Sequence, residues 1–265
     1  MGWIEALILG IIQGLTEFLP VSSSGHIEIG KVLLGVNVTE NLIFSVVVHG
    51  ATTLSTIIIF RQQILNLLKG LFKFKYNFET QYVFKIFISM IPVFVLYEIL
   101  GDKIESVFNG NMLLVGSMLI ITALLLTFTY YKKTGEKEVS FWNSFVIGVS
   151  QAIAILPGIS RSGATISTAL LVGVDKEKST EFSFLMVLIP IIGGNFLKIM
   201  DYVDTPATAN TIHPSALIIG FIAAFISGLF ACTWMIKIVK RGKLIYFAIY
   251  CFIIGLAAIT YSILK

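Results

Sequence analysis

One motif occurs twice in this sequence, and its two copies constrain the fold more strongly than any other feature. Both copies place glutamine, serine, glycine and proline inside an otherwise apolar stretch, and they lie 138 residues apart. The matched positions are Gly10 and Gly148, Gln13 and Gln151, Ser22 and Ser160, Ser24 and Ser162, Gly25 and Gly163, Gly35 and Gly173, Phe44-Ser45 and Phe182-Ser183, with Pro20 and Pro157 one residue out of register. Identities at one fixed spacing indicate a duplicated structural unit.

The composition places this repeat in a membrane. Hydrophobic residues make up 56% of the 265 residues and charged residues 13%, and the mean hydropathy is +0.91. These values predict a single integral membrane domain over residues 1–265. The net charge of +4 does not indicate nucleic acid, because the basic residues lie in short loops between apolar runs. Cys232 and Cys251 lie in apolar stretches without metal-like or redox-like spacing, so we expect both to be packing residues.

The first apolar segment is too short to span a bilayer. It runs for sixteen residues from Ile4 to Leu19, before Pro20 and a serine-glycine turn. At about 1.5 Å per residue it covers roughly 24 Å, whereas the bilayer core is about 30 Å thick. We therefore expect a re-entrant half-helix that turns back near the midplane, followed by a short helix from about Gly25 to Leu34. The N-terminus lacks a basic leader and a small-residue cleavage site, so this segment is expected to stay in the mature protein.

The remaining apolar runs predict an all-α polytopic fold with six full spans. The second unit begins with its own re-entrant pair, from Phe141 to Val174. The predicted spans are Asn41 to Phe60, Val83 to Leu100, Met112 to Tyr131, Phe182 to Met200, Ser215 to Met235 and Leu244 to Leu264. Because each unit (residues 1–131 and 139–265) has three spans, an odd number, the second must be inserted upside down. The sequence therefore predicts an inverted-topology repeat.

The basic residues give an independent prediction of the orientation. The predicted loops on one side hold fourteen of the nineteen: Arg61, Lys69, Lys73, Lys75, Lys85, Lys132, Lys133, Lys137, Lys176, Lys178, Lys237, Lys240, Arg241 and Lys243. The opposite side keeps Lys31, Lys103, Lys198 and Lys265, and Arg161 lies in an intramembrane turn. By the positive-inside rule the richer side is cytoplasmic, which places both termini outside and lets the two turns meet near the midplane.

The two turns carry polar groups that suit an anion. Each turn precedes a short helix, whose free N–H groups and positive dipole end bind anions. Arg161 adds a planar cation that fits a pair of phosphate oxygens. The alternative is that Ser22 to Ser24 and Ser160 only cap helices. That alternative does not account for Arg161, because a buried guanidinium needs an anionic partner, and Glu17 is the only carboxylate nearby.

Two further groups in the first turn suggest chemistry. His26 could reach a serine hydroxyl and act as its base or acid, or it could be a packed histidine bonded to a backbone carbonyl. Gln13 and Glu17 lie four residues apart on one helix face and offer oxygen ligands for Mg²⁺ or Ca²⁺. The alternative for Glu17 is that it only neutralises Arg161.

Both motifs closely resemble those of the bacterial undecaprenyl-diphosphate phosphatase family of the bacitracin-resistance type. The motifs are Gln13-x-x-x-Glu17 followed by Pro20-Val-Ser22-Ser23-Ser24-Gly25-His26, and Pro157-Gly158-Ile-Ser160-Arg161-Ser162-Gly163. The resemblance covers nearly the whole chain. It implies an enzyme of the bacterial plasma membrane that uses a divalent cation to remove the terminal phosphate of undecaprenyl diphosphate, which regenerates the lipid carrier for peptidoglycan.

The resemblance also implies a role for each motif residue. Glu17 and Gln13 match the metal-associated acidic motif, Ser22 and Ser23 the essential serines, His26 the catalytic histidine and Arg161 the phosphate-binding arginine. Many members of the family have Glu where Gln13 stands, which shifts the binding of Mg²⁺ or Ca²⁺ toward Glu17.

The sequence thus predicts phosphoryl transfer in a pocket that opens to the outer leaflet. We expect Ser23 to be the nucleophile, Ser22 to support the turn, and His26 to act as general base and then acid. The predicted diphosphate-binding residues are Arg161, Ser160, Ser162, Ser24, Gly25 and Gly163. A metal-activated water without a phosphoserine is the alternative mechanism. The alternative function is a lipid or solute transporter, since many transporters share inverted repeats with broken helices. The sequence is compatible with a homodimer.

Overall fold

The described residues of a computed structural model, residues 1–36, 42–105, 111–132, 135–204 and 212–264, are almost entirely helical. They form twelve α-helices and one isolated β-bridge between Lys137 and Val174. The helices are α1 (Trp3–Phe18), α2 (Ser23–Leu34), α3 (Leu42–Ile59), α4 (Arg61–Leu71), α5 (Phe78–Glu105), α6 (Met112–Tyr131), α7 (Phe141–Ile153), α8 (Arg161–Leu171), α9 (Lys176–Met186), α10 (Leu188–Asp204), α11 (Pro214–Lys240) and α12 (Ile245–Leu264).

Several of these helices are long and apolar enough to cross a membrane. In the described part of the chain there are five such segments, and a sixth if α3 and α4, which are bent by 75° at Phe60, count as one broken span. The five are Phe78–Leu100, Met112–Tyr131, Lys176–Met200, Pro214–Lys240 and Ile245–Leu264. The helices indicate a multi-pass membrane protein. Five of the six predicted spans correspond to these segments, and the remaining one, over Asn41 to Phe60, corresponds to α3.

Two helix boundaries differ from the sequence prediction. Residues Arg61 to Leu71 were expected to lie in a loop but form α4, because Ile64 and Leu67 pack against the hydrophobic core while the polar residues face outward. The predicted span over Phe182 to Met200 starts earlier, at Lys176, and is divided at Val187 into α9 and α10. In both regions charged residues interrupt the apolar pattern, so the helix is longer than its apolar part.

The two short helix pairs have matching turns. α1 ends at Phe18, and Leu19 is extended, as expected for a residue before a proline. α2 begins at Ser23, two residues before the predicted start, and the Ser22 hydroxyl caps it by accepting from the Gly25 N–H at 3.2 Å. In the second half, the Ser160 hydroxyl caps α8 by accepting from the Gly163 N–H at 3.0 Å. Ser22 and Ser160 are therefore helix caps, whatever else they do.

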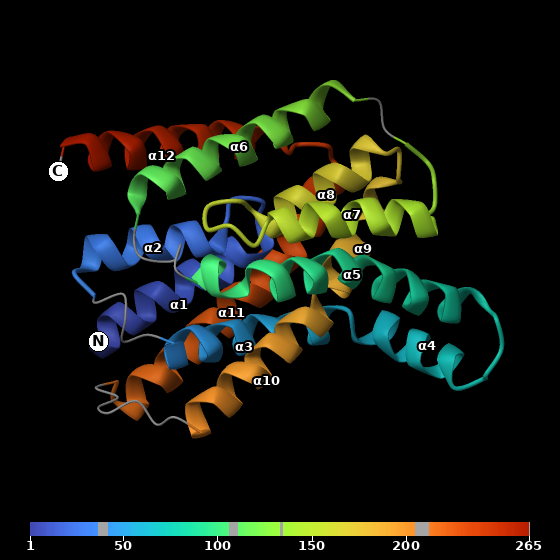
Figure 1. Ribbon diagram of the computed structural model, residues 1–265, viewed down its shortest axis with the longest axis horizontal. Helices are drawn as coiled ribbons and strands as arrows, with labels where there is room; N and C mark the ends of the chain where they lie inside the picture. Colours follow the sequence, from blue (N-terminus) through green and yellow to red (C-terminus); the bar gives the residue numbers. More distant parts are fainter. Residues whose placement is uncertain (37–41, 106–110, 133–134, 205–211, 265) are drawn as a thin grey trace.

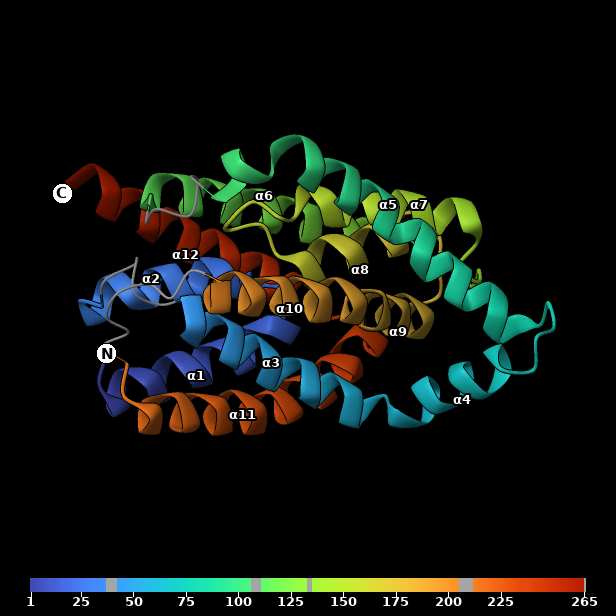
Figure 2. The same ribbon diagram turned by 60° about the horizontal axis from the view of Figure 1, so that its bottom comes forward.

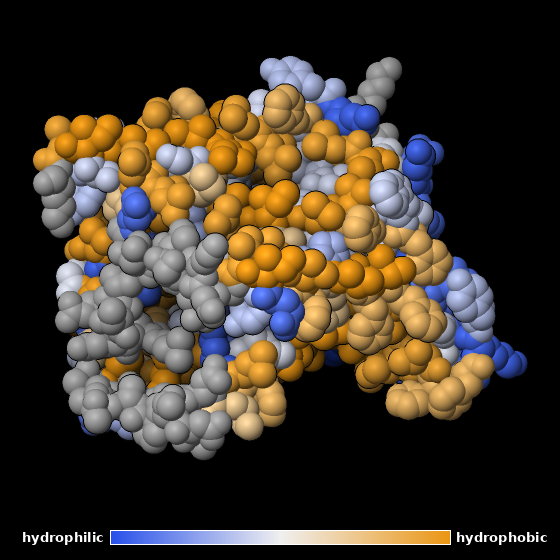
Figure 3. All heavy atoms as spheres, in the orientation of Figure 1, coloured by the Kyte–Doolittle hydropathy of each residue, from blue (hydrophilic) through white to orange (hydrophobic). Residues whose placement is uncertain are grey.

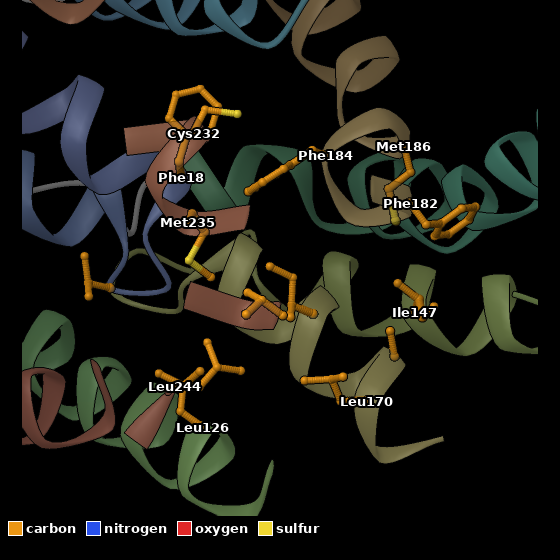
Figure 4. Close-up of a cluster of buried hydrophobic side chains, with 14 of the residues drawn as sticks. Phe18, Leu126, Ile147, Leu170, Phe182, Phe184, Met186, Cys232, Met235 and Leu244 are labelled. Atoms are coloured by element: carbon orange, nitrogen blue, oxygen red, sulfur yellow. The ribbon is translucent and has the colours of Figure 1, made fainter. Parts of the chain in front are cut away.

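The two halves of the chain pack into one another. Figures 1 and 2 show α6 lying along α12, and α1 lying along α11. Glycines permit the closest approach: a Cβ on Gly116 would lie 2.7 Å from the Gly255 carbonyl oxygen, and a Cβ on Gly255 would lie 2.8 Å from that of Gly116. The core in Figure 4 likewise draws on both halves, with the rings of Phe18 and Phe184 5.7 Å apart edge to face. Cys232 and Cys251 are free and buried, as predicted.

The surface is divided along the long axis of the molecule. The N-terminus and the end of α12 lie at the left in Figures 1 and 2, whereas α4 and its connection to α5 lie at the right. The face in Figure 3 is largely hydrophobic, and hydrophilic residues gather at its right edge, where Figure 1 places α4. Such a surface suits a bilayer around the middle of the molecule and water at the end that carries α4.

Candidate active site

The turn after α1 and the start of α8 meet at an ion pair. The guanidinium of Arg161 donates from Nη2 to Oε1 of Glu17. The Ser162 hydroxyl donates to the Leu19 carbonyl oxygen at 3.1 Å, and a Cβ on Gly25 would lie 3.2 Å from Cα of Gly158. The prediction that the two turns meet is therefore confirmed. Arg161 is the cationic partner that a buried carboxylate requires, since the Glu17 side chain is only 6% exposed.

The second oxygen of Glu17 collects two further hydrogen bonds. Oε2 accepts from the Gln13 amide at 2.9 Å and from the Ser23 hydroxyl at 2.6 Å. The bond from Ser23 is short and ends on a charged acceptor, which is the stronger kind of hydrogen bond. Glu17 can therefore take the proton of Ser23 directly if this hydroxyl attacks a phosphorus.

Ser22 holds the first turn in a strained conformation. Its φ is 71°, in the left-handed region that non-glycine residues rarely adopt. Besides capping α2, its hydroxyl lies 3.3 Å from that of Ser24. Strain of this kind costs about 1–3 kcal/mol and is found at functional sites, where the surrounding structure fixes it.

His26 does not bond to a serine hydroxyl in the described structure, contrary to one sequence expectation. Its Nδ1 lies 2.8 Å from the Ser22 carbonyl oxygen and its Nε2 lies 2.8 Å from the Tyr250 hydroxyl. A carbonyl can only accept, so Nδ1 carries the proton and Nε2 accepts from Tyr250 when the ring is neutral. Both nitrogens are thus occupied, and His26 is placed to hold the Ser22 carbonyl. The packed-histidine alternative matches this geometry.

The second turn is tied to the first half of the chain through α6. The backbone N–H of Ser160 donates to the Thr122 hydroxyl at 3.0 Å, and the hydroxyls of Ser160 and Ser162 are 3.3 Å apart. Gly158 has a φ of 99°, and a Cβ there would lie 2.6 Å from the Val115 carbonyl oxygen, so only glycine fits this position. The main chain, rather than side chains alone, therefore places Arg161.

Sequence reasoning missed His49 of α3. Its Nε2 lies 3.9 Å from Oε2 of Glu17, and its Nδ1 lies 2.9 Å from the Ser45 carbonyl oxygen. One signal was available: Ser45, His49, Thr52, Thr53 and Thr56 recur at helical spacing within an apolar run. Such a polar stripe in a membrane helix indicates a face turned toward a site inside the protein. Tyr250 was also missed, and nothing in the sequence links it to His26.

The donor set fits a divalent cation only as part of a substrate complex. In the part of the chain that the structure describes, no three His, Cys, Asp or Glu side chains group together as a metal site. The candidate oxygen ligands are the Glu17 carboxylate and the side-chain amide oxygen of Gln13. This Gln13 oxygen is buried and accepts no hydrogen bond in the described structure. Mg²⁺ commonly takes one or two protein oxygens and completes its shell with phosphates and water. These residues fit that limited role.

Comparison with known proteins gives full-length matches. The family model described as bacitracin resistance protein BacA matches residues 6–257. Proteins named undecaprenyl-diphosphatase are similar over nearly the whole of both chains. One from Bacteroides fragilis is 53% identical over 100% of each chain, and one from Christiangramia forsetii is 55% identical over 97% of each. One from Methanosphaera stadtmanae is 34% identical over 98% of each chain.

Proposed function

The chain belongs to the bacitracin resistance protein BacA family, and from this membership we propose that it hydrolyses undecaprenyl diphosphate to undecaprenyl phosphate and phosphate. It is a membrane hydrolase that recycles the lipid carrier of cell-wall synthesis, the activity associated with bacitracin resistance. The observation that carries the proposal is the short bond from Ser23 to Glu17 beside Arg161. A hydroxyl, a base and a cation at one point are what a phosphoryl transfer requires.

Ser23 is the nucleophile in this proposal. Its oxygen forms a bond to the terminal phosphorus while the bond from that phosphorus to the bridging oxygen breaks, and its proton passes to Glu17. Arg161 uses one N–H on Glu17 and has four others for the phosphoryl oxygens. The N–H groups at the starts of α2 and α8 add positive potential. Glu17 thus takes the base role that the sequence suggested for His26, and His26 positions the Ser22 carbonyl.

A divalent cation bound with the substrate would be held by the Glu17 carboxylate and the side-chain amide oxygen of Gln13, and it would neutralise charge on the diphosphate. Ser24, Gly25, Ser160 and Gly163 lie at the starts of α2 and α8, and in this proposal they shape the space for the phosphates. The Ser162 hydroxyl instead donates to the Leu19 carbonyl oxygen. These roles remain predictions that mutation can test.

The expected result for the purified protein in detergent is release of phosphate from undecaprenyl diphosphate. Ser23→Ala should abolish this release, because no other hydroxyl is hydrogen bonded to Glu17 in the described structure. Ser150→Ala is the matched control, since Ser150 lies on α7 and donates only to the Ile147 carbonyl oxygen. A wild-type protein that releases no phosphate would contradict the proposed function.

The packing supports an inverted repeat of residues 1–131 and 139–265. A shift of 138 residues carries α1 onto α7 and the first part of α5 onto α11, and α1 packs on α11 just as α7 packs on α5. Gly10 faces the Gly220 carbonyl oxygen, and its repeat partner Gly148 faces that of Ser89. We propose that both termini lie outside, that α4 lies in the cytoplasm, and that the site is reached from the outer leaflet of the bacterial plasma membrane.

Cysteine labelling tests this orientation. In the α4–α5 connection, Tyr76 is 70% exposed and suits replacement by cysteine. The adjacent Asn77 does not, because its side chain caps α5. In a background with Cys232 and Cys251 replaced, Tyr76→Cys should react with an impermeant maleimide only after the cells are permeabilised. Trp3→Cys, at the other end of the molecule, should react in intact cells. Labelling of Tyr76→Cys in intact cells would invert the orientation.

A further inference from the structure

A pocket extends from the ion pair into the space between α1, α3, α8, α9 and the start of α10. Glu17 and Arg161 form one part of its wall, and the aromatic ring of Phe184 forms another. The remaining polar wall consists of six hydroxyl side chains: Thr52, Thr53, Thr56, Ser162, Thr165 and Ser183. In a chain with several apolar helices long enough to span a membrane, six hydroxyls beside a carboxylate are unlike a packed apolar core, and they favour a polar occupant.

Five of these six hydroxyls have already used their single proton. Each donates to a main-chain carbonyl oxygen: Thr52 and Thr53 to His49 at 3.0 and 2.8 Å, Thr56 to Thr52 at 3.1 Å, Thr165 to Arg161 at 2.9 Å and Ser162 to Leu19 at 3.1 Å. A hydroxyl oxygen whose proton is donated can only accept from a further molecule. Together with the carboxylate of Glu17, these oxygens make a wall of acceptors, which opposes a phosphate and favours a molecule that can donate.

Ser183 is the exception. It is 3% exposed, and its hydroxyl oxygen makes no hydrogen bond within the described structure. A buried hydroxyl without a partner is costly unless something else satisfies it. Because Ser183 lines the pocket, a molecule bound there could accept its hydrogen bond. Ser183 and the Arg161 guanidinium can donate, and the other oxygens can accept.

We propose that this pocket holds the water molecule that hydrolyses the phosphoserine formed at Ser23. A water can donate two hydrogen bonds and accept two, which matches the mixed wall. The cavity volume of about 20 Å³ also suits a water and not a phosphate, since about 10–15 Å³ is enough for one water. The inference rests on the proposed function and adds its second reactant: in a site surrounded by lipid, water needs a defined place.

The second half of the reaction then balances without another reagent. The proton that Glu17 took from Ser23 leaves with the prenyl monophosphate, so Glu17 is again a carboxylate. The water oxygen forms a bond to phosphorus while the bond from phosphorus to the Ser23 oxygen breaks. One water proton passes to Glu17 and then to the Ser23 oxygen. The products are inorganic phosphate and free Ser23.

Filling the pocket separates the two halves of the reaction. Ser183→Val places two methyl groups where the water is expected, while Ser23, Glu17 and Arg161 stay unchanged. With substrate carrying ³²P in its terminal phosphate, the variant should release about one prenyl monophosphate per protein in a burst. It should then hold the label as phosphoserine at Ser23, and its steady-state rate should fall about ten- to a hundredfold. Thr56→Leu fills the same pocket from α3 and should give the same burst.

Ser179→Val is the matched control, because Ser179 is also a buried serine of α9 without a hydrogen-bond partner but does not line the pocket. It should turn over at the wild-type rate without trapped label. Ser183→Ala leaves the space open and should lose less than about tenfold. A wild-type rate in both filled variants would overturn the proposal, and so would a stable variant that lacks the burst. A wild type without hydrolysis would instead refute the proposed function.

Discussion

Glu17→Gln is expected to lower kcat/KM for undecaprenyl diphosphate by about a thousandfold, within the range of about 10²–10⁴ for removal of a general base. Glutamine has nearly the same shape and can still accept a hydrogen bond from Ser23. It cannot take the serine proton, and it leaves Arg161 without its counter-ion. Because the proposed proton transfer to Glu17 accompanies formation of the first bond to phosphorus, this variant should show no burst and no phosphoserine, unlike Ser183→Val.

The measurement is phosphate release over a range of Mg²⁺ and Ca²⁺ concentrations and in chelator. If Glu17 also serves the cation, added metal should restore only part of the lost activity, because Gln13 supplies no negative charge. Glu5→Gln, on the same helix but far from the turn, is the control and should keep wild-type activity. Wild-type activity of Glu17→Gln in chelator would show that Glu17 only neutralises Arg161.

Much of this site could be predicted because its residues are local to the two turns. A proline follows the end of both α1 and α7, serines cap α2 and α8, and these rules operate within a few residues along the chain. The pairing of Glu17 with Arg161 was the alternative to a metal role for Glu17, and it was suggested by the cost of leaving either charge buried alone. The two residues are far apart in the sequence, one in each repeat unit. Their pairing could still be considered without knowledge of the packing, since no other carboxylate occurs in either turn region.

The parts that could not be predicted depend on helices that pack from elsewhere. The sequence offered His26 as a partner of the serine hydroxyls, but its side chain lies against the Ser22 carbonyl, and its ring stacks on that of Tyr250 from α12. His49 reaches Glu17 only because α3 packs against α1. α4 was missed for a different reason: its amphipathic pattern carries a basic end that resembles a cytoplasmic loop.

The ion pair explains why a charged site can be stable in an apolar fold. Glu17 accepts hydrogen bonds from Arg161, Gln13 and Ser23, so the protein solvates the carboxylate well. A pair of this kind is costly to break from one side, by about 3–5 kcal/mol when it is fully buried. The same contact therefore fixes the proposed base and its neighbouring cation before substrate arrives, which is the form of preorganisation that stabilises a charged transition state.

Arg161→Lys is expected to lower kcat/KM by about ten- to a hundredfold with little loss of stability. Lysine keeps the charge that Glu17 needs, but it is a compact point charge without the paired N–H geometry that a phosphoryl group accepts from arginine. One charge-assisted hydrogen bond is worth roughly 1.5–3 kcal/mol, which corresponds to that loss in rate. Prenyl-diphosphate hydrolysis and the thermal midpoint, measured on the same preparations, test both parts of the expectation.

Two further variants separate the binding role of Arg161 from its structural role. Arg161→Ala leaves Glu17 as a buried carboxylate without its cation and should cost up to about 3 kcal/mol, the low end for a broken buried pair, because the arginine side chain is 30% exposed. Combining Arg161→Ala with Glu17→Gln removes both charges and should restore most of that stability. If Arg161 binds the diphosphate, the double variant stays inactive although it is stable. An Arg161→Lys protein with undiminished kcat/KM would show instead that the arginine serves only as the counter-ion of Glu17, since any cation would then suffice.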